Sequence, residues 1–121
     1  MTLNYYKQEL KETATTLAKS GKGILAVDES TKTIGKRLAS INVDNTEENR
    51  KVYRGLLFTT EGLGEFISGA ILFEETLFQE HTDGESMVKK LQKLGIIPGI
   101  KVDKGLSSLA GGTTLRPSVR D

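Results

Sequence analysis

Three short, largely apolar runs separated by segments with helical periodicity constrain the fold of this chain more than any other feature. The runs are Ile24–Val27, Ile67–Phe73 and Ile96–Val102. Continuous apolar runs of this length are typical of strands buried on both faces, as in parallel sheets. The alternation of strand-like and helix-like segments therefore predicts an α/β fold with a parallel sheet.

The spacing of apolar residues between the runs predicts the helices. We expect helices over Tyr5–Lys19, around Ile34 to Ile41, from Asp44 to about Thr59, and over Ser86–Leu94. His81 is expected in a surface loop, and residues 111–121 form an aperiodic, loose tail. In the helix that ends near Thr59, we expect one inward apolar face (Val52, Tyr53, Leu56, Leu57) and one solvated charged face (Glu47, Glu48, Arg50, Lys51, Arg54).

The composition excludes several classes of function. With 121 residues, the chain has the length of a single small domain. Its 17 basic and 16 acidic residues lack the excess of positive charge expected of a nucleic-acid binder. The absence of cysteine and the single His81 argue against disulfides, thiol nucleophiles and a multi-histidine metal site. The apolar runs are too short to span a membrane, so no membrane association is expected.

Ionisable residues follow each predicted strand. Asp28 follows the first strand, Glu74 and Glu75 follow the second, and Lys101 lies near the end of the third. Because ligands bind at the carboxyl ends of parallel strands, these groups are candidates for a shared site. Alternation along the third strand places Lys101 on the same face as Asp103, where it either pairs or binds an anion, or extends to water. Asp28 is either a catalytic carboxylate or the cap of the following turn.

The segment after the first strand is rich in hydroxyl groups and cations. Such residues suit phosphate binding at the start of a helix. The alternative is an ordinary capped helix with a solvated basic face, because Gly21-Lys22-Gly23 precedes the strand and does not form a phosphate-binding loop of the Walker type. The residues concerned are Ser30, Thr31, Lys32, Thr33, Lys36 and Arg37.

Several of these segments together resemble one family. From about Tyr5 to Gly111, the sequence is similar to class I fructose-bisphosphate aldolases, which cleave their substrate through a lysine Schiff base. The resemblance rests on Gly21–Thr31, Gly35–Leu38, Asn45–Arg50, Ile71–Leu77, Pro98–Gly105 and Leu109–Gly111.

The resemblance implies a TIM (β/α)₈ barrel, of which this chain holds the N-terminal helix and about three β/α units. It further implies the reversible cleavage of fructose 1,6-bisphosphate to dihydroxyacetone phosphate and glyceraldehyde 3-phosphate, in glycolysis and gluconeogenesis, without metal or cofactor. Asp28 and Lys101 match catalytic residues of the family. Ser30 and Arg37 match phosphate-binding residues, and Arg50 matches an arginine that is sometimes included in the substrate site. No lysine of this sequence matches the Schiff-base lysine.

The sequence departs from the family at two places. Lys32 and Thr33 replace the usual glycine and serine, and residues 112–121 diverge altogether. We therefore expect residues 1–111 to be the N-terminal part of an aldolase barrel, residues 112–121 to be a disordered tail, and the isolated chain to be inactive. A barrel of this type needs about 250 residues.

Other interpretations remain open at this point. The chain is alternatively a non-catalytic truncated product that binds full-length aldolase or another partner, or a phosphate-binding remnant that uses Ser30, Arg37 and Lys101. Full-length relatives are expected to be homotetramers. Because the first helix begins close to Met1, we expect a cytoplasmic location, with a plastid as the alternative for the parent enzyme.

Overall fold

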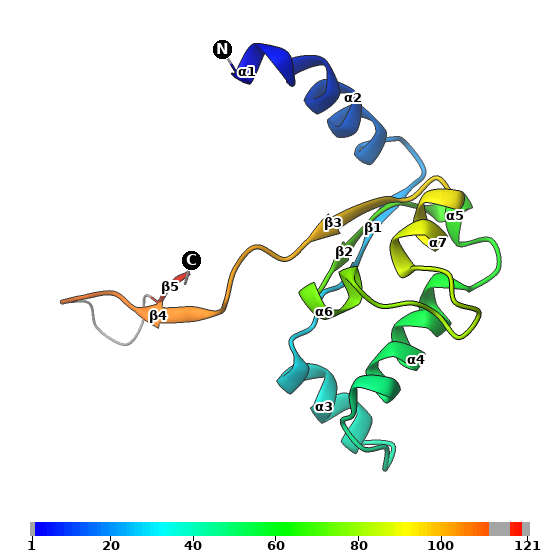
Figure 1. The fold of residues 1–121 in the computed structure, drawn as a ribbon. Helices are drawn as coiled ribbons and strands as arrows, with labels where there is room; N and C mark the ends of the chain where they lie inside the picture. Colours follow the sequence, from blue (N-terminus) through cyan, green and yellow to red (C-terminus); the bar gives the residue numbers. More distant parts are fainter. Residues whose placement is uncertain (1, 112–116, 120–121) are drawn as a thin grey trace.

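The fold centres on a three-stranded parallel sheet, as the sequence predicts. The computed structural model describes residues 2–111 and 117–119. Strands β1 (Gly23–Val27), β2 (Ile67–Leu72) and β3 (Ile97–Ile100) lie in the order β1-β2-β3 (Figure 1). The helices are α1 (Thr2–Tyr5), α2 (Lys7–Leu17), α3 (Thr31–Ala39), α4 (Glu47–Phe58), α5 (Leu63–Phe66), α6 (Glu74–Leu77) and α7 (Met87–Lys93).

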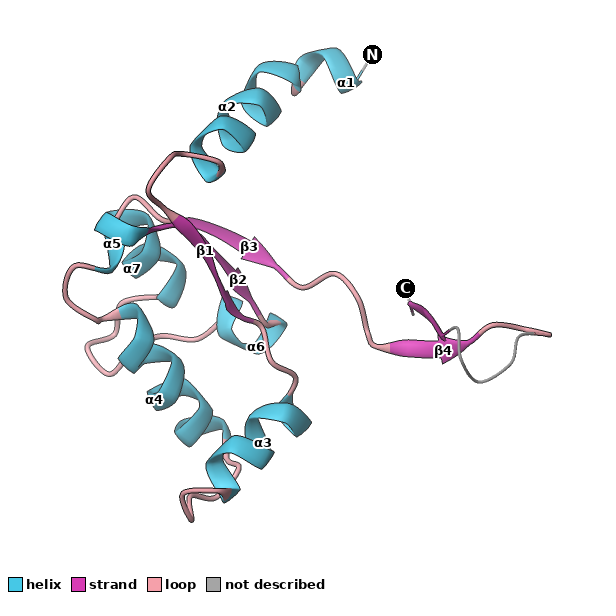
Figure 2. Cartoon of the chain, turned by 180° about the vertical axis from the view of Figure 1, so that it is seen from behind, coloured by secondary structure: helices cyan, strands magenta, loops and turns pink. Residues whose placement is uncertain are grey.

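One face of the sheet carries the core. Val27 pairs with Leu72, and Leu72 pairs with Ile100, so these side chains share a face. Helices α4, α5 and α7 lie on the same side of the sheet (Figure 2). The core consists of buried apolar residues from the sheet, from α4 and α7, and from the turn before β3: Val27, Phe58, Ala70, Leu72, Met87, Leu91 and Ile96.

The opposite face of the sheet is largely open in the described part of the chain. Ile24 is 53% exposed, and Ala26 is exposed as well. Helix α2 contacts the sheet at its amino end. A Cβ at Gly69, on the open face, would collide with the Leu17 side chain, and the Ser68 hydroxyl donates to the Leu17 carbonyl at 2.8 Å. The site described below therefore lies at the end of a half-covered sheet.

Helix α4 corrects the prediction for its inner face. The residues that it buries are Arg50, Arg54, Gly55 and Phe58. Val52 and Leu56, which were expected to face inward, are 51% and 67% exposed. The prediction of a solvated charged face is thus wrong for the two arginines. Their charge is tolerated there because carbonyl oxygens and a carboxylate lie within reach, as shown below.

The third strand is shorter than predicted. It ends at Ile100, two residues before the expected end at Val102. The Lys101 N–H still donates to the Leu72 carbonyl at 2.9 Å, so the backbone keeps its course beside β2 for one more residue. Lys101 therefore leaves the sheet at the same edge as the residues that follow β1 and β2.

Both ends of the described chain extend away from the sheet (Figures 1 and 2). Helix α2 buries none of its residues. At the other end, β4 (Leu106–Ser108) pairs antiparallel with β5 (Pro117–Val119), so the prediction of a loose tail is wrong at these three positions. A short backbone ladder needs no apolar periodicity, which is why the sequence did not reveal it. The rest of the predicted tail from residue 112 onward lies outside the described residues. No described helix is long and apolar enough to cross a membrane.

Candidate functional site

The carboxyl ends of the three parallel strands surround a cavity of about 850 Å³. Four of the five candidate site residues line it: Asp28, Ser30, Arg37 and Lys101. The fifth, Arg50, is not among the lining residues. The lining carries balanced charge, with the carboxylates of Asp28, Glu29, Glu74 and Asp103 facing the cations of Lys32, Arg37, Lys101 and Lys104.

Lys101 lies between two carboxylates. Its Nζ is 3.4 Å from Asp28 Oδ2 and 3.3 Å from Asp103 Oδ2. The pKa of Lys101 is raised, first by Asp103 and then by Asp28, which keeps the ammonium group charged. The Asp103 pKa is lowered, first by the Gly105 N–H that donates to it at 2.9 Å and then by Lys101. Lys101 is therefore a paired cation and not a lysine that simply extends to water.

Asp28 does not cap the following helix. That role belongs to Ser30, whose Oγ accepts from the Thr33 N–H at 3.3 Å. The Asp28 carboxylate is thus free of the structural role that was its alternative, and it faces Lys101 across the cavity with 24% of its side chain exposed. Asp103 is a further residue of the site that the sequence prediction does not include, although its alternation with Lys101 is a signal that identifies it.

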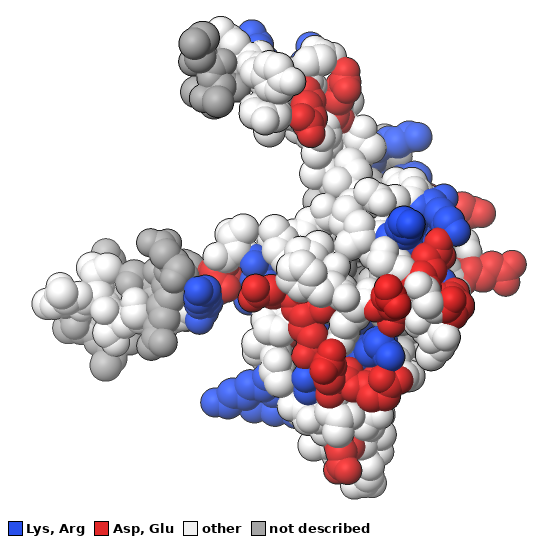
Figure 3. Space-filling view, viewed as in Figure 1, with Lys and Arg blue, Asp and Glu red and all other residues white. Residues whose placement is uncertain are grey.

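Two hydroxyl groups at the start of α3 and a cation from its last turn line the cavity. Ser30 Oγ and Thr33 Oγ1 are 3.1 Å apart, and Arg37 Nη1 is 3.2 Å from Glu29 Oε2. Arg37 remains 56% exposed, whereas Glu29 is 10% exposed, so the guanidinium is available at the cavity rim. Basic side chains project from α3 in the space-filling view (Figure 3). This arrangement can bind an anion and also serves as an ordinary helix cap.

Arg50 acts behind the cavity. Its Nε and Nη2 donate to the two oxygens of Glu75 at 2.8 and 2.7 Å, which lowers the pKa of Glu75. Its Nη1 donates to Asn45 Oδ1 at 2.9 Å, and Asn45 Nδ2 donates to the Thr31 carbonyl at 3.0 Å. Arg50 is therefore connected to the start of α3, where the candidate phosphate-binding hydroxyl groups lie, through the side chain of Asn45.

Arg54 is the buried cation beneath the site, and the sequence prediction missed it. Its side chain is 0% exposed. Nε donates to the Val27 carbonyl at 3.2 Å, Nη2 donates to the Glu29 carbonyl at 2.6 Å, and the guanidinium carbon lies 5.5 Å from the centre of the Phe73 ring. Burial lowers the pKa of Arg54. The signal was its helical spacing, four residues from both Arg50 and Phe58.

No cluster of three or more His, Cys, Asp or Glu side chains that could hold a metal ion occurs among residues 2–111 and 117–119. The described site thus offers carboxylates, ammonium and guanidinium groups, and hydroxyls. Groups of these kinds can transfer protons and can bind hydroxylated or phosphorylated compounds.

Comparisons with known proteins show which family the chain belongs to. The family model for "Fructose-bisphosphate aldolase class-I" matches residues 9–116. The chain belongs to the class I fructose-bisphosphate aldolase family. Its resemblance to these aldolases, and the TIM-barrel family that the resemblance implied, are thereby confirmed.

The aldolase relatives are similar over most of this chain. A chloroplastic aldolase of Arabidopsis thaliana is 62% identical over 106 residues, which cover 88% of this chain and 27% of the relative. An aldolase of Plasmodium berghei is 65% identical over 102 residues, covering 84% and 28%. The solved aldolase of Plasmodium falciparum, in complex with TRAP and a small-molecule inhibitor, superposes with a TM-score of 0.89 at 57% identity, covering 93% of this chain and 32% of that one. The chain thus spans little more than a quarter of the length of the aldolases it matches.

Proposed function

We propose that this chain supplies the N-terminal wall of an aldolase site that cleaves fructose 1,6-bisphosphate reversibly into dihydroxyacetone phosphate and glyceraldehyde 3-phosphate. The observation that carries the proposal is the Asp28–Lys101 pair, 3.4 Å apart at the carboxyl ends of β1 and β3. Both residues line the cavity, and neither is needed to cap a helix or fill the core. Membership of the aldolase family supplies the reaction class.

In this proposal Asp28 transfers a proton. Cleavage of the carbon–carbon bond requires removal of a proton from the neighbouring hydroxyl group, so that its oxygen becomes the carbonyl oxygen of the released aldehyde. The bonding electrons pass to the Schiff-base nitrogen. A carboxylate is a suitable acceptor for this proton, and the neighbouring Lys101 ammonium group is proposed to contact substrate oxygens. By resemblance, the Schiff-base lysine is a residue other than the lysines of this sequence.

Ser30 and Arg37 are proposed to bind a substrate phosphate. The hydroxyl groups of Ser30 and Thr33 lie at the amino end of a nine-residue helix, where N–H groups and the helix dipole favour an anion. Arg37 adds a bidentate donor at the rim. Arg50 stays a weaker prediction, since its guanidinium is already occupied by Glu75 and Asn45.

The decisive experiment is a chimera in which residues 9–111 replace the matching segment of the Arabidopsis chloroplastic relative. We expect fructose 1,6-bisphosphate cleavage with kcat/KM within about tenfold of the relative. A soluble chimera with intact secondary structure and no cleavage would contradict the proposal. The matched negative is the 121-residue chain itself, treated with borohydride and dihydroxyacetone phosphate. We expect no covalent adduct, and an adduct would show that a lysine of this chain acts as the nucleophile.

A second candidate function is binding of full-length aldolase or another partner. It is favoured by the sheet itself, since β1 and β3 are its outer strands and Ile100 beside the site is 42% exposed. Unpaired strand edges readily accept a further strand. Co-purification with full-length aldolase tests it: we expect Ile100→Lys to abolish capture, while the exposed helix variant Val52→Lys retains it. Equal capture by both variants would remove this candidate.

The assembly and the compartment are part of the same proposal. We propose that the site operates in a homotetrameric aldolase of the cytoplasm, in glycolysis and gluconeogenesis. The relatives include chloroplastic and cytosolic aldolases, so a plastid is the alternative compartment. Fractionation of cells with an antibody against residues 9–111 distinguishes the two.

A further inference from the structure

Arg54 holds the backbone on both sides of Asp28. Its guanidinium donates to the carbonyl of Val27, the residue before Asp28, and to the carbonyl of Glu29, the residue after it. The guanidinium is a rigid planar fork, so two N–H donors in one plane set the separation and direction of the two carbonyls. These two hydrogen bonds hold the backbone of the segment that carries the Asp28 side chain.

The same side chain connects the end of β1 to the end of β2. Its guanidinium lies over the ring of Phe73, which follows β2 and lines the cavity, and its Nη1 is 3.8 Å from Glu75 Oε1. Nη1 has no hydrogen-bond partner among the described residues. A fully buried cation with incomplete pairing is costly, which argues that it is kept for position and not for stability alone.

We propose that Arg54 is a positioning residue for Asp28, and that its fork sets the distance between the Asp28 carboxylate and Lys101. The inference rests on the proposed aldolase function for its consequence in catalysis. Its structural part, the dependence of the Asp28–Lys101 contact on Arg54, stands independently of that function. The contact is already at 3.4 Å, so a displacement of Asp28 by one ångström would break it.

The structural part is tested in the 121-residue chain by a double-mutant cycle. The pKa of Lys101 is followed by NMR through its Cε resonance, with and without Asp28→Asn. With Arg54 present, we expect Asp28→Asn to lower this pKa. In Arg54→Met and Arg54→Lys we expect Asp28→Asn to have no effect, because the two groups no longer meet. An unchanged effect of Asp28→Asn in either variant would overturn the proposal.

The Arg54→Lys variant distinguishes the effect of the hydrogen-bond geometry from the effect of the positive charge. It keeps the charge and the aliphatic stem but cannot donate to two carbonyls in a fixed plane. If Arg54→Lys restores the coupling, charge alone is sufficient and the fork is not required. The lysine variant also decides the question when the methionine variant does not fold.

The catalytic part is tested in the chimera described above. We expect Arg54→Lys to lower kcat at least about tenfold, with a much smaller change in KM. The control is Leu91→Ala, which truncates a buried core residue of α7 that forms no hydrogen bond or ion pair with the Arg54 guanidinium in the described part of the chain; we expect it to lower thermal stability without lowering kcat. An inactive chimera that retains Arg54 would count against the aldolase function, whereas the NMR cycle would still decide the role of Arg54. Full kcat in Arg54→Lys would overturn the positioning role.

Discussion

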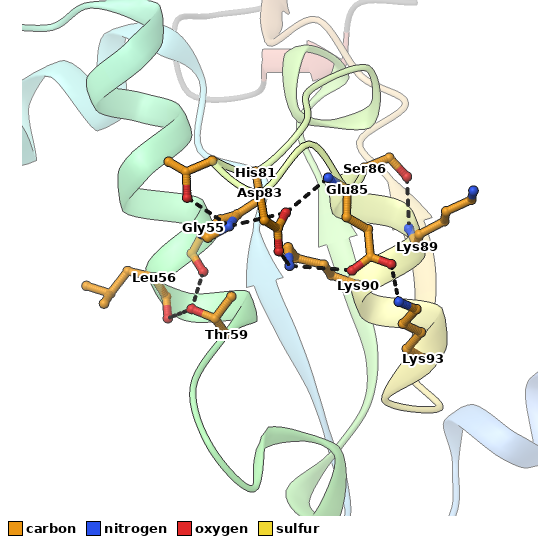
Figure 4. Close-up of polar contacts among 11 residues, drawn as sticks. Gly55, Leu56, Thr59, His81, Asp83, Glu85, Ser86, Lys89, Lys90 and Lys93 are labelled. Atoms are coloured by element: carbon orange, nitrogen blue, oxygen red, sulfur yellow. Dashed lines mark hydrogen bonds and ion pairs between the residues drawn. The ribbon is translucent and has the colours of Figure 1, made fainter.

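Two lysines in this molecule each hold a pair of carboxylates, and the surroundings of the two clusters differ. Lys101 lies at the carboxyl end of the sheet, between Asp28 and Asp103. Lys90 lies on α7, 2.5 Å from Asp83 and 3.5 Å from Glu85 (Figure 4). We refer to Asp28, Lys101 and Asp103 as the cavity cluster, and to Asp83, Glu85, Lys90 and Lys93 as the loop cluster.

The loop cluster is closed within one short stretch of chain. Asp83 and Glu85 belong to the turn before α7, and Lys93 pairs with the second oxygen of Glu85. The cavity cluster instead joins residues 73 positions apart and opens onto the cavity of about 850 Å³, whereas Glu85, Lys90 and Lys93 line a cavity of only about 220 Å³. The comparison teaches that a lysine held by two carboxylates does not by itself identify a site. The loop cluster pairs residues that are close in sequence, whereas the cavity cluster brings a lysine and a carboxylate from different strands to the large cavity.

The largest expected difference between the clusters is in catalysis. In the chimera, Asp28→Asn is expected to lower kcat by about a hundredfold or more, because the amide cannot accept the hydroxyl proton. Asp83→Asn, the matched change in the loop cluster, is expected to leave kcat unchanged. Steady-state cleavage assays measure both. Equal losses would mean that the two clusters do not differ in function.

The next effect concerns stability and contrasts the loop cluster with the buried Arg50–Glu75 pair behind the cavity. Arg50→Met is expected to reduce the free energy of unfolding by roughly 2 kcal/mol, because Glu75 loses two short charged hydrogen bonds while partly buried. Lys90→Met in the loop cluster should cost clearly less, since its partner Asp83 is half exposed to water. Urea denaturation of both variants provides the test, and a greater loss for Lys90→Met would reverse the comparison.

The loss of a helix cap is a smaller effect that can be compared between the two clusters, because a serine caps a helix beside each of them. Ser30 caps α3 beside the cavity cluster, and Ser86 caps α7 beside the loop cluster, accepting from the Lys89 N–H at 3.1 Å. Replacing either serine by alanine should reduce stability by about 1 kcal/mol. Only Ser30→Ala should also raise KM for fructose 1,6-bisphosphate in the chimera. An unchanged KM would leave Ser30 with its capping role alone.

The smallest expected effect is the pH dependence of the loop cluster. Lys90 donates to Asp83 and lowers its pKa from 3.8 to about 2. Since the folded pKa is below the unfolded one, the resulting stabilisation is present above about pH 4 and is lost as the pH falls through 2. Asp83→Asn should therefore flatten the decline in stability between pH 5 and pH 2, as measured by acid titration of circular dichroism. An equally steep decline would show that Asp83 contributes nothing.

The sequence predicted the strands, and it predicted that the candidate residues meet at the carboxyl ends of these strands. Apolar runs locate β1, β2 and β3 to within two residues at each end, and the rule for parallel sheets brings Asp28 and Lys101 together. The roles of these residues, and those of Ser30 and Arg37, stay predictions until the chimera is assayed.

The buried arginines could not be predicted in the same way. Analysis by helical periodicity places polar side chains on the solvent-exposed face of a helix, so it predicted that Arg50 and Arg54 would be exposed. Their burial depends on Glu75 and on the carbonyls of Val27 and Glu29, which are distant in sequence. A similar long-range contact explains Gly55, where any Cβ would collide with the half-buried ring of His81, a residue expected on the surface.

The contacts around Asp28 also imply an order of assembly during folding. The two hydrogen bonds of Arg54 close sequence separations of 27 and 25 residues, whereas the Lys101–Asp28 contact closes a separation of 73. The longer closure costs about 1 kcal/mol more in chain entropy. During translation, Arg54 can therefore form its hydrogen bonds to the segment around Asp28 once α4 has left the ribosome and well before β3 emerges. Lys101 then pairs with a carboxylate whose backbone is already in place.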